Sequence, residues 1–514
     1  MTAVARGLEA ASLLLAVLLV AILATGGWKL AGVTLSRPED VLIALVVVTA
    51  ARTLVAPLRL PAVIPRRAVV GGIALYAVLM GFVTVTRHRA LLTHALDLGY
   101  YVQVVWAIAH GLPARVSLPP MHAWGDHFSP VLYLLAPLGW LTSVAPALLL
   151  AQTLILAAGA LAVYGFARHR LQDPALAAGF ALLYLVNPSL HGINIRDIHP
   201  QAFAIPLLIA AALALDTGRW GWCAVALVLT AGCREDAAIP LVGFGLWAAL
   251  ARRRWKAGAV IAVAAVAVLL FDTRVLMPYF RGEPYPHLIK RYAHLGNSVP
   301  DVLVTLLVRP WRWLPVLLNP VKCVYLGALL APLAFLPLLA PAALAGALPA
   351  LAVNLLTFDR VLFHHRTQYQ AFVLPFLILA AVDGCVTLRA WAVRRGWTRP
   401  SPRAVLIAAF LVSVVLTSRT INDLMVTRWR LGPEQRAVRA LMRRIPDGVP
   451  VSVNERLQPH LAKREEAYIY PTAVERSRYV LEIDGELARR PPPPGFVVEA
   501  AERGWTLLRR DAGR

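Results

Sequence analysis

The sequence has 514 residues, of which 59% are hydrophobic and 15% are charged. A typical soluble domain is about half apolar and about one quarter charged, so this composition excludes a chain made only of soluble globular domains. The formal net charge of +23 lies largely in short clusters between apolar runs, and no basic patch with interleaved aromatic residues occurs. We therefore predict an integral membrane protein and no nucleic-acid partner.

Apolar runs recur along the chain, and an α-helix of about 20 apolar residues crosses a hydrocarbon core about 30 Å thick. The first run is longer than a signal-peptide core and lacks a small-residue cleavage site, so we expect a retained span. Spans are predicted at 8–27, 39–57, 68–86, 147–167, 174–190, 201–216, 220–233, 237–251, 257–277, 322–339, 342–357, 370–388 and 403–418. The expected fold is an α-helical polytopic membrane protein with about 13 transmembrane helices.

Basic loops predict the orientation of these spans, because Lys and Arg collect on the cytoplasmic side. With the N-terminus in the cytoplasm, every basic loop is cytoplasmic provided that the apolar segment 128–142 does not cross. That segment has internal prolines and is only marginally long enough to span, which favours an interfacial or half-inserted helix. The longer polar loops then lie outside the plasma (inner) membrane, at 87–146, 191–200, 278–321 and 358–369.

The C-terminal region, from about Arg419, is also expected on the outer side, and its composition differs from that of the spans. Short strand-like stretches read VPVSVN, AYIYP, YVLEID, GFVVEA and WTLLRR, and Pro433 begins a helical stretch that runs to Met442. We predict a small soluble α/β domain at 419–514. It follows a transmembrane domain at 67–418 and two extra N-terminal helices within 1–66.

Two groups in the first outer loop could carry chemistry. Asp97 stands alone among apolar residues after a span, where an unpaired carboxylate is costly; it is either a functional residue or an N-cap of the next helix. Further along, Asp126 and His127 follow His122, which allows a divalent metal site or, as the plainer interpretation, a turn.

Two further outer segments are unusually polar. The segment NPSLHGINIRDIHPQAF includes Arg196, Asp197 and His199, and indicates a water-filled site, with a surface Arg196–Asp197 pair as the alternative. The triplet at 234–236 interrupts an apolar stretch at a predicted tight outer turn, where Gly, Asn or Ser would be more usual, so we favour a functional role for Arg234 and Glu235.

The remaining outer loops offer cations beside aromatic rings. Lys290 and Arg291 follow PYPHLI, and His365 and Arg366 lie in FHHRTQYQ. These residue types suit a phosphate group and a ring-shaped substrate, although interfacial anchoring is a common alternative. P-loop, dinucleotide-binding, HExxH and GxSxG motifs do not occur in a fitting context, which argues against nucleotide-driven transport and standard hydrolase chemistry.

Five phrases within 85–385 resemble a bacterial and archaeal family of predicted polytopic membrane proteins of unknown function. They read ALDLGYYVQVVWAIAHG, GDHFSPVLYLLAPLGWL, DIHPQAFAIP, CREDAAIPL and YPHLIKRYAHLG. That family is similar in turn to the GT-C class of membrane glycosyltransferases, in which an acidic residue follows an early span as Asp97 does here. The resemblance implies a GT-C-like bundle, and 128–140 matches the proline-rich interfacial helix of that class.

The resemblance further implies transfer of a sugar from a polyprenyl-phosphate donor to an acceptor at the outer face. Asp97 would act as the catalytic base or hold a divalent cation, Mg²⁺ or Mn²⁺, with Asp126 and His127 as further ligands. Many relatives place a second carboxylate beside the first, whereas Leu98 follows Asp97 here. A two-carboxylate site would therefore borrow Asp126 or Glu235.

The donor phosphate would be bound by basic residues of the outer loops. We expect Arg234 in this role, with His199 and His365 beside it and help from Arg196, Lys290, Arg291 or Arg366. The expected partners are membrane lipid and a lipid-linked sugar donor. Two alternatives remain: a transporter or flippase for a lipid-linked or polar substrate, and a non-catalytic scaffold or sensor.

Overall fold

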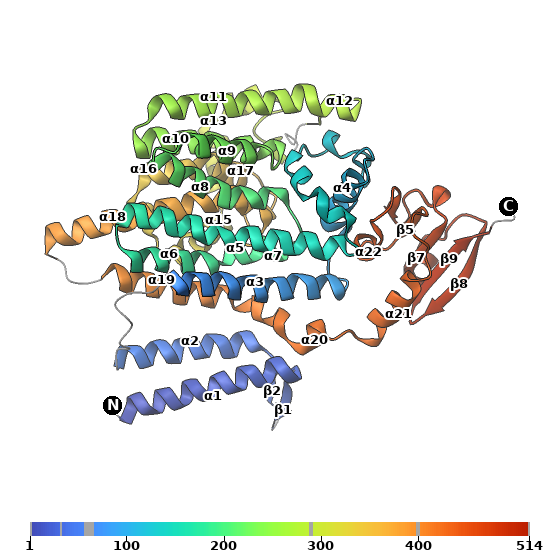
Figure 1. The fold of residues 1–514 in the computed structure, drawn as a ribbon, viewed down its shortest axis with the longest axis horizontal. Helices are drawn as coiled ribbons and strands as arrows, with labels where there is room; N and C mark the ends of the chain where they lie inside the picture. Colours follow the sequence, from blue (N-terminus) through green and yellow to red (C-terminus); the bar gives the residue numbers. More distant parts are fainter. Residues whose placement is uncertain (1–2, 31–32, 56–65, 287–290, 397–400, 512–514) are drawn as a thin grey trace.

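A computed structural model describes residues 3–30, 33–55, 66–286, 291–396 and 401–511. Most of them form a bundle of roughly parallel and antiparallel helices, with a small sheet domain at one end (Figure 1). Within the described residues, 7 helical stretches are long and apolar enough to cross a membrane. They are Ala3–Thr25 (α1), Arg66–Arg89 (α3), Val144–Leu171 (α5), Pro174–Ile195, Trp255–Arg281, Leu374–Arg395 (α18) and Pro402–Leu424.

Three of these stretches contain more than one helix. Pro174–Ile195 comprises α6 (Pro174–Leu185) and α7 (Pro188–Ile195), and Trp255–Arg281 contains α11 (Trp255–Phe271), the π-helical turn η6 (Asp272–Leu276) and α12 (Met277–Arg281). Pro402–Leu424 joins α19 (Pro402–Thr417) to η12 (Ser418–Leu424). Other helices are α2 (Pro38–Val55), α4 (Tyr100–Ala109), α8 (Ala204–Asp216), α9 (Trp220–Ala231), α10 (Ala238–Arg252), α13 (Val299–Val308), α14 (Pro310–Leu317), α15 (Pro320–Leu330), α16 (Pro341–Leu344) and α17 (Leu348–Leu355).

Every predicted span range contains helix, which confirms the helical membrane fold. The number of membrane crossings depends on how the bent and the short apolar helices are counted. Helices α14 and α15 are bent by 61° about a short break and can count as one further span, and several apolar helices are shorter than 18 residues. The expected number of about 13 spans therefore stays a prediction.

The segment 128–142 forms η3, a 3-10 helix over Pro130–Trp140, rather than a spanning α-helix. At about 2 Å of rise per residue, its 11 residues reach about 22 Å, less than the hydrocarbon thickness. It packs on α4, and Trp140 Nε1 donates to the Ala109 carbonyl over 2.8 Å. Tyr133 and Leu134 on its outer surface are exposed, as an interfacial helix requires.

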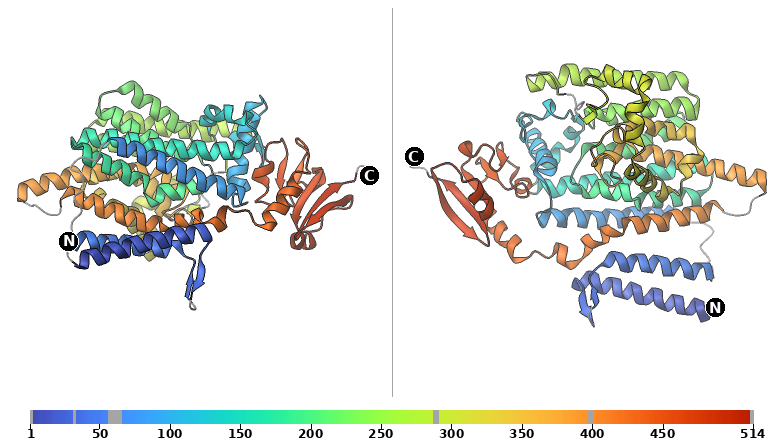
Figure 2. Two further views of the ribbon diagram at one scale, coloured as in Figure 1. Left: turned by 60° about the horizontal axis from the view of Figure 1, so that its bottom comes forward. Right: turned by 180° about the vertical axis from the view of Figure 1, so that it is seen from behind.

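The two ends of the bundle differ in what they carry. The N-terminus and the connections after α5, α8, α10 and α18 lie at one end, and α4, α12 and the C-terminal sheet lie at the other (Figure 1). Helices α1 and α2 stand beside α19 and α20 (Val426–Trp429), at the edge of the bundle (Figures 1 and 2). A short hairpin of β1 (Trp28–Leu30) and β2 (Val33–Leu35) joins them.

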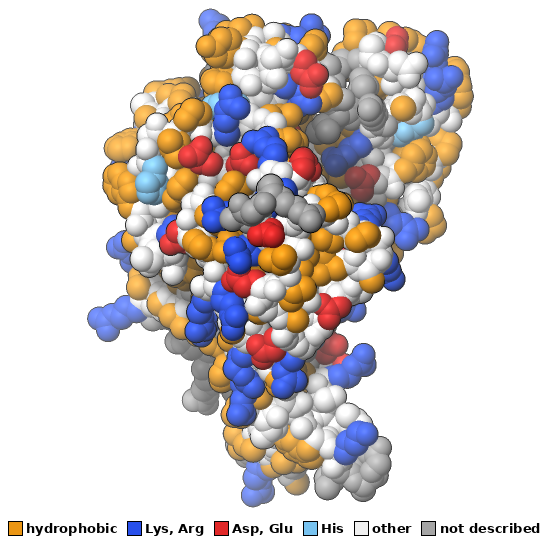
Figure 3. Space-filling model, turned by 90° about the vertical axis from the view of Figure 1, so that its right-hand side faces the viewer, with side chains coloured by type: hydrophobic (Ala, Val, Ile, Leu, Met, Phe, Trp, Pro, Cys, Tyr) orange, Lys and Arg blue, Asp and Glu red, His pale blue; other side chains and the backbone are white. Residues whose placement is uncertain are grey.

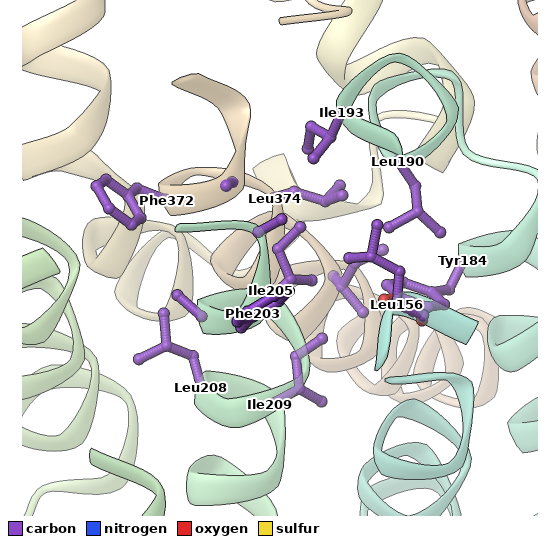
Figure 4. Close-up of a cluster of buried hydrophobic side chains, with 14 of the residues drawn as sticks. Leu156, Tyr184, Leu190, Ile193, Phe203, Ile205, Leu208, Ile209, Phe372 and Leu374 are labelled. Carbon is purple, nitrogen blue, oxygen red and sulfur yellow. Dashed lines mark hydrogen bonds between the residues drawn. The ribbon is translucent and has the colours of Figure 1, made fainter. Parts of the chain in front are cut away.

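The centre of the bundle is an apolar core that fixes the position of α7. Figure 4 shows side chains from α5, α6, α7, α8 and α18 meeting there, among them Leu156, Leu190 and Ile205. The Tyr184 hydroxyl, fully buried in this core, donates to the Leu156 carbonyl over 2.8 Å. Because α7 is anchored on this core, the polar residues that follow it are held in place.

The C-terminal domain contains the predicted helix and all of the predicted strands. Helix α21 spans Pro433–Met442, and the strands are β5 (Val451–Val453), β6 (Ala467–Ile469), β7 (Tyr479–Ile483), β8 (Phe496–Glu502) and β9 (Trp505–Arg510). The strand order is β6-β5-β7-β9-β8, with β5 parallel to both of its neighbours and the other pairs antiparallel. Short helices α22 (Gln458–Leu461) and α23 (Asp484–Arg489) complete this α/β domain.

Contacts with the first outer loop hold this domain against the bundle. A Cβ at Gly99 would overlap the Gln458 side chain of α22, so this close approach requires glycine. Buried Gln103 of α4 donates to the Arg464 and Glu465 carbonyls over 3.0 and 2.8 Å and accepts from the Ser117 amide over 2.9 Å. Ser117 lies in a hairpin of β3 (Arg115–Ser117) and β4 (Pro120–His122).

Replacing Gln103 by alanine is expected to loosen this contact, because the buried Arg464 carbonyl and Ser117 amide lose their side-chain partner, at about 1–3 kcal/mol for each unsatisfied group. Hydrogen exchange of the amides at 464–467 should accelerate while exchange within the β7–β9 pairing stays slow. Gln172→Ala is the matched control, because Gln172 is exposed and donates only to the His169 carbonyl nearby. Unchanged exchange in Gln103→Ala would show that Gln103 does not hold the domain.

Candidate functional site

A cleft of about 720 Å³ lies between the bundle and the C-terminal domain. Its walls come from the first outer loop, α7, the 358–369 loop, the end of α19 and the domain itself. Figure 3 shows basic and acidic side chains interspersed over this end of the molecule. The residues that line the cleft are Arg87, Leu92, His94, Leu96, Asp97, Gly192, Ile195, Arg196, Asp197, His364, Arg366, Arg419, Asp423 and Glu455.

Asp97 lies in a π-helical turn, η1 (Ala95–Gly99), directly before α4. His94 is the N-cap of this turn, so the alternative interpretation of Asp97 as an N-cap is wrong. The ring of buried His199 donates from Nε2 to Asp97 Oδ1 over 3.1 Å. Among the described residues, Asp97 Oδ2 has no hydrogen-bond partner, and the side chain is 40% exposed to the cleft.

The charges around Asp97 keep its carboxyl group ionised. Burial alone raises the pKa of Asp97, but the charge and hydrogen bond of His199, together with His94 and Arg196, outweigh burial and lower the pKa below its usual value. Asp97 is therefore a carboxylate at neutral pH. Such a group can accept a proton or attract a cation, but it cannot serve as a proton donor.

Asp197 positions the loop that carries Asp97. It has a φ of +56°, a left-handed conformation that Asp tolerates better than most residues, and its side chain is 6% exposed. Its Oδ2 accepts from the His94 backbone amide over 2.9 Å and lies 3.5 Å from the His94 Nδ1. The alternative of a surface Arg196–Asp197 pair is therefore wrong, because Asp197 is buried and binds His94.

The His94–Asp197 contact makes a pH-dependent contribution to stability. The hydrogen bond to Asp197 raises the pKa of His94 above its usual value of about 6.5. The protonated ring therefore stabilises the fold fully below about pH 6.5, and this contribution is lost as the pH rises through the higher folded-state pKa. As the pH rises above about 6.5, we expect the melting temperature to fall by more in the natural chain than in His94→Gln. Parallel pH profiles of the two proteins would contradict this assignment.

Three arginines of the cleft have no carboxylate partner among the described residues: Arg196, Arg366 and Arg419. By contrast, Arg87 pairs with Asp423 over 3.3 Å. Burial lowers the pKa of Arg366, and the neighbouring charges of Arg419, Arg196 and Arg87 lower it further, outweighing the effect of Asp423. A cluster of cations that repel one another in a cleft is suited to an anion.

Close packing brings two of these arginines together. Gly192 of α7 lies against the 358–369 loop, and a Cβ at Gly192 would be only 2.5 Å from the Arg366 Cα. Glycine therefore allows α7 to approach the main chain that carries Arg366. Arg196 follows the end of α7, so both guanidinium groups face the same cleft.

Five titratable residues of the cleft were not singled out from the sequence: Arg87, His94, Arg419, Asp423 and Glu455. Arg87 lies in the last turn of α3, where it resembles an ordinary membrane anchor, and Glu455 comes from the C-terminal domain. Arg419, Asp423 and Glu455 are far from Asp97 in the sequence, so only the tertiary fold brings them to it. His94 carries the one local signal, since it lies three residues before Asp97 in a polar turn.

The predicted residues at 126–127 and 234–235 form a second cluster outside the cleft lining. His127 Nδ1 lies 3.0 Å from Glu235 Oε1, and the Phe128 amide donates to Glu235 Oε2 over 3.1 Å. Burial lowers the pKa of His127, but the charge of Glu235 outweighs this and raises it above its usual value. Glu235 thereby fixes the start of η3.

In the same cluster, Arg234 donates from Nε to Asp236 Oδ1 over 2.7 Å. The turn at 234–236 is thus an internally paired turn, with η5 (Glu235–Ala237) leading into α10. Buried Tyr101 experiences the charges of both Arg234 and Asp97. Arg196 and Arg366 line the cleft, whereas Arg234 does not. The phosphate-binding role of Arg234 remains a prediction.

The remaining predicted residues lie beside the cleft or outside the described part of the chain. Arg291 pairs with Asp359 over 3.5 Å, and Lys290 lies outside the described residues. His365 stacks on His364 with ring centroids 5.2 Å apart, and burial together with His364 and the nearby arginines lowers the pKa of His365 to about 4. His365 is thus neutral at pH 7.

The predicted metal ligands do not come together. Among the described residues, no group of three or more His, Cys, Asp or Glu side chains is arranged to hold a metal ion. Asp97 binds His199, whereas His127 binds Glu235 in the other cluster. A site made from Asp97, Asp126 and His127 is therefore not supported by this geometry.

Comparison with known proteins assigns the chain to a family. The model of the predicted membrane protein family DUF2079 matches residues 87–490, which include the whole cleft. The chain belongs to the DUF2079 family. This confirms the predicted membership of a family of polytopic membrane proteins of unknown function. No curated protein matches this DUF2079 chain in sequence.

Solved structures show which fold the DUF2079 protein has. ArnT from Cupriavidus metallidurans bound to undecaprenyl phosphate is similar with a TM-score of 0.53 and 14% identity, over 88% of this chain and 99% of ArnT. ArnT in the apo state gives a TM-score of 0.51 and 12% identity, over 86% and 98% of the two chains. ArnT is a GT-C glycosyltransferase, so the DUF2079 chain has a GT-C-like fold.

Proposed function

We propose that this protein is a membrane glycosyltransferase that moves a sugar from a polyprenyl-phosphate donor to an acceptor hydroxyl at the outer face of the membrane. One observation supports this most: an ionised carboxylate, Asp97, shares a cleft with three arginines that lack carboxylate partners among the described residues. The fold adds support, because a protein of similar fold is known bound to undecaprenyl phosphate.

In the proposed reaction, Asp97 Oδ2 accepts the proton of the acceptor hydroxyl while the hydroxyl oxygen attacks the anomeric carbon of the donor sugar. The bond from that carbon to the phosphate oxygen breaks, and the lipid phosphate leaves with the electron pair. Arg196, Arg366 and Arg419 stabilise the charge on the departing phosphate. His199 holds Asp97 through Oδ1 and leaves Oδ2 for the acceptor.

The same account places the cleft and the C-terminal domain outside the inner membrane. The end of the bundle away from the cleft carries the connections rich in arginine, such as Arg252–Arg254 after α10, which favours a cytoplasmic position for that end. A cysteine introduced in place of exposed Asp447 should react with an impermeant maleimide from outside intact cells. Labelling only after the cytoplasm is opened would overturn this topology.

A transporter for a lipid-linked substrate is the alternative, because charges in a membrane cleft also line transport pathways. Proteoliposomes that contain the purified chain and a radiolabelled polyprenyl-phosphate sugar separate the two functions. A transferase moves the label to an added acceptor and leaves unlabelled polyprenyl phosphate. Movement of the intact labelled donor between leaflets, without transfer, would favour the transporter.

A further inference from the structure

A second cavity lies at the end of the bundle opposite the cleft. It has a volume of about 600 Å³ and is formed by the last turns of α5, the end of α8 and the start of α9. Figure 1 shows these helix ends on the side of the N-terminus, away from the C-terminal domain. Its lining residues include Gly165, Arg168, Leu213, Thr217, Arg219 and Trp222.

The basic residues of this cavity lack acidic partners, unlike their neighbours at the same end. Arg252 binds Asp216 and Asp383, each over 2.8 Å, and Arg170 binds Asp383 over 2.8 Å. Among the described residues, Arg168 and Arg219 form no ion pair, and no Asp or Glu lines the cavity. The cavity is thus a local positive site beside a network whose charges are neutralised.

The floor and rim of the cavity match a lipid headgroup at the membrane surface. Gly165 and Leu213 form part of an apolar floor where α5 meets α8, because a Cβ at Gly165 would be only 2.7 Å from a Leu213 methyl group. Trp222 on the rim is 70% exposed, and Trp220 is 50% exposed with the Arg254 guanidinium 4.9 Å from its ring centre. Tryptophan beside arginine at helix ends is typical of the boundary between headgroups and acyl chains.

We propose that this cavity binds the headgroup of an anionic phospholipid, with Arg168 and Arg219 on the phosphate. The exposed Trp222 indole faces the same space and can donate a hydrogen bond to a glycerol or phosphate oxygen. The Thr217 hydroxyl donates to the Leu213 carbonyl over 2.8 Å, and its oxygen can accept from a glycerol hydroxyl. The acyl chains leave along the apolar outer surface of α9, where Val225 and Val228 are exposed. This site is independent of the proposed transfer reaction and lies at the other membrane surface.

Native mass spectrometry of the full-length chain in detergent tests the proposal, with phosphatidylglycerol titrated as the probe. Each of Arg168→Gln and Arg219→Gln should weaken the first phosphatidylglycerol bound by about fivefold, and the double variant by about 25-fold, since each basic residue near an anionic headgroup contributes about 1 kcal/mol. Arg394→Gln is the matched control, because Arg394 is exposed at the same end and lies outside the cavity lining.

Two further probes identify the source of the phosphate. Phosphatidylcholine with the same acyl chains should bind weakly and equally to all variants, and soluble glycerol phosphate should not displace phosphatidylglycerol at millimolar concentration. Equal phosphatidylglycerol affinity in the natural chain and the double variant would overturn the site. So would an equal loss in Arg394→Gln, or displacement by glycerol phosphate. If the double variant fails to fold, the two single variants carry the same comparison.

Discussion

Replacing Asp97 by asparagine is expected to reduce sugar transfer by about 10²- to 10⁴-fold, the usual contribution of a general base. Asparagine keeps the shape of the side chain and can still accept the His199 hydrogen bond at Oδ1, so the loop should remain in place. What disappears is the negative charge that accepts the proton. The loss should therefore appear in kcat, while the affinity for the donor stays unchanged or rises because the cleft becomes more positive.

The matched control for Asp97→Asn is Asp126→Asn. Asp126 is also an outer-loop carboxylate that the sequence indicates as a candidate, but it does not line the cleft. We expect near-normal transfer in Asp126→Asn, measured with a radiolabelled polyprenyl-phosphate sugar in proteoliposomes. Full activity in Asp97→Asn, or an equal loss in both variants, would remove the catalytic role of Asp97.

The second large effect is expected from Arg366→Ala, which should weaken binding of a polyprenyl phosphate by about 10- to 100-fold. A hydrogen bond to a charged group contributes about 1.5–3 kcal/mol, and about 1.4 kcal/mol corresponds to tenfold in affinity. Replacing Arg366 removes its repulsion by Arg419 and Arg196 together with its attraction to Asp423, and it removes one hydrogen bond, to Thr420 over 3.0 Å. Because these effects oppose one another, folding should be preserved, which separates a binding role from a structural one.

Binding of polyprenyl phosphate to the Arg366→Ala variant can be measured by scintillation proximity with a labelled lipid. Arg360→Ala is the control, because Arg360 is exposed in the same loop and does not line the cleft. Raised salt should weaken binding to the natural chain more than to Arg366→Ala. Equal affinities in all three proteins would place the phosphate elsewhere.

Much of the fold follows from local sequence patterns. Pro433 at the first helical position and the alternating strands of the tail predict the C-terminal elements closely, and apolar runs predict the positions of the bundle helices. The prolines within 130–140 indicate a segment that does not continue as a regular α-helix. These features depend on residues close together in the chain, so no tertiary information is needed.

The site is harder to predict because its parts come from distant segments. Asp97, Arg196 and Arg366 are conspicuous as polar residues in outer loops, and the cleft does bring them together. The equally conspicuous Arg234 and Asp126 lie outside the cleft lining, in a separate cluster in which Arg234 pairs with Asp236 and His127 pairs with Glu235. Arg87 and Arg419 flank spans and look like topology signals in the sequence, but in the folded chain both residues line the cleft.

The most direct measurement is a cryo-electron microscopy structure of the chain with bound undecaprenyl phosphate. If the cleft binds the donor as proposed, we expect density for the phosphate within hydrogen-bond distance of Arg366 and of Arg196 or Arg419. Asp97 should face the position of the sugar. Density for the phosphate beside Arg234, in the second cluster, or an empty cleft in a lipid-bound particle would contradict this proposal.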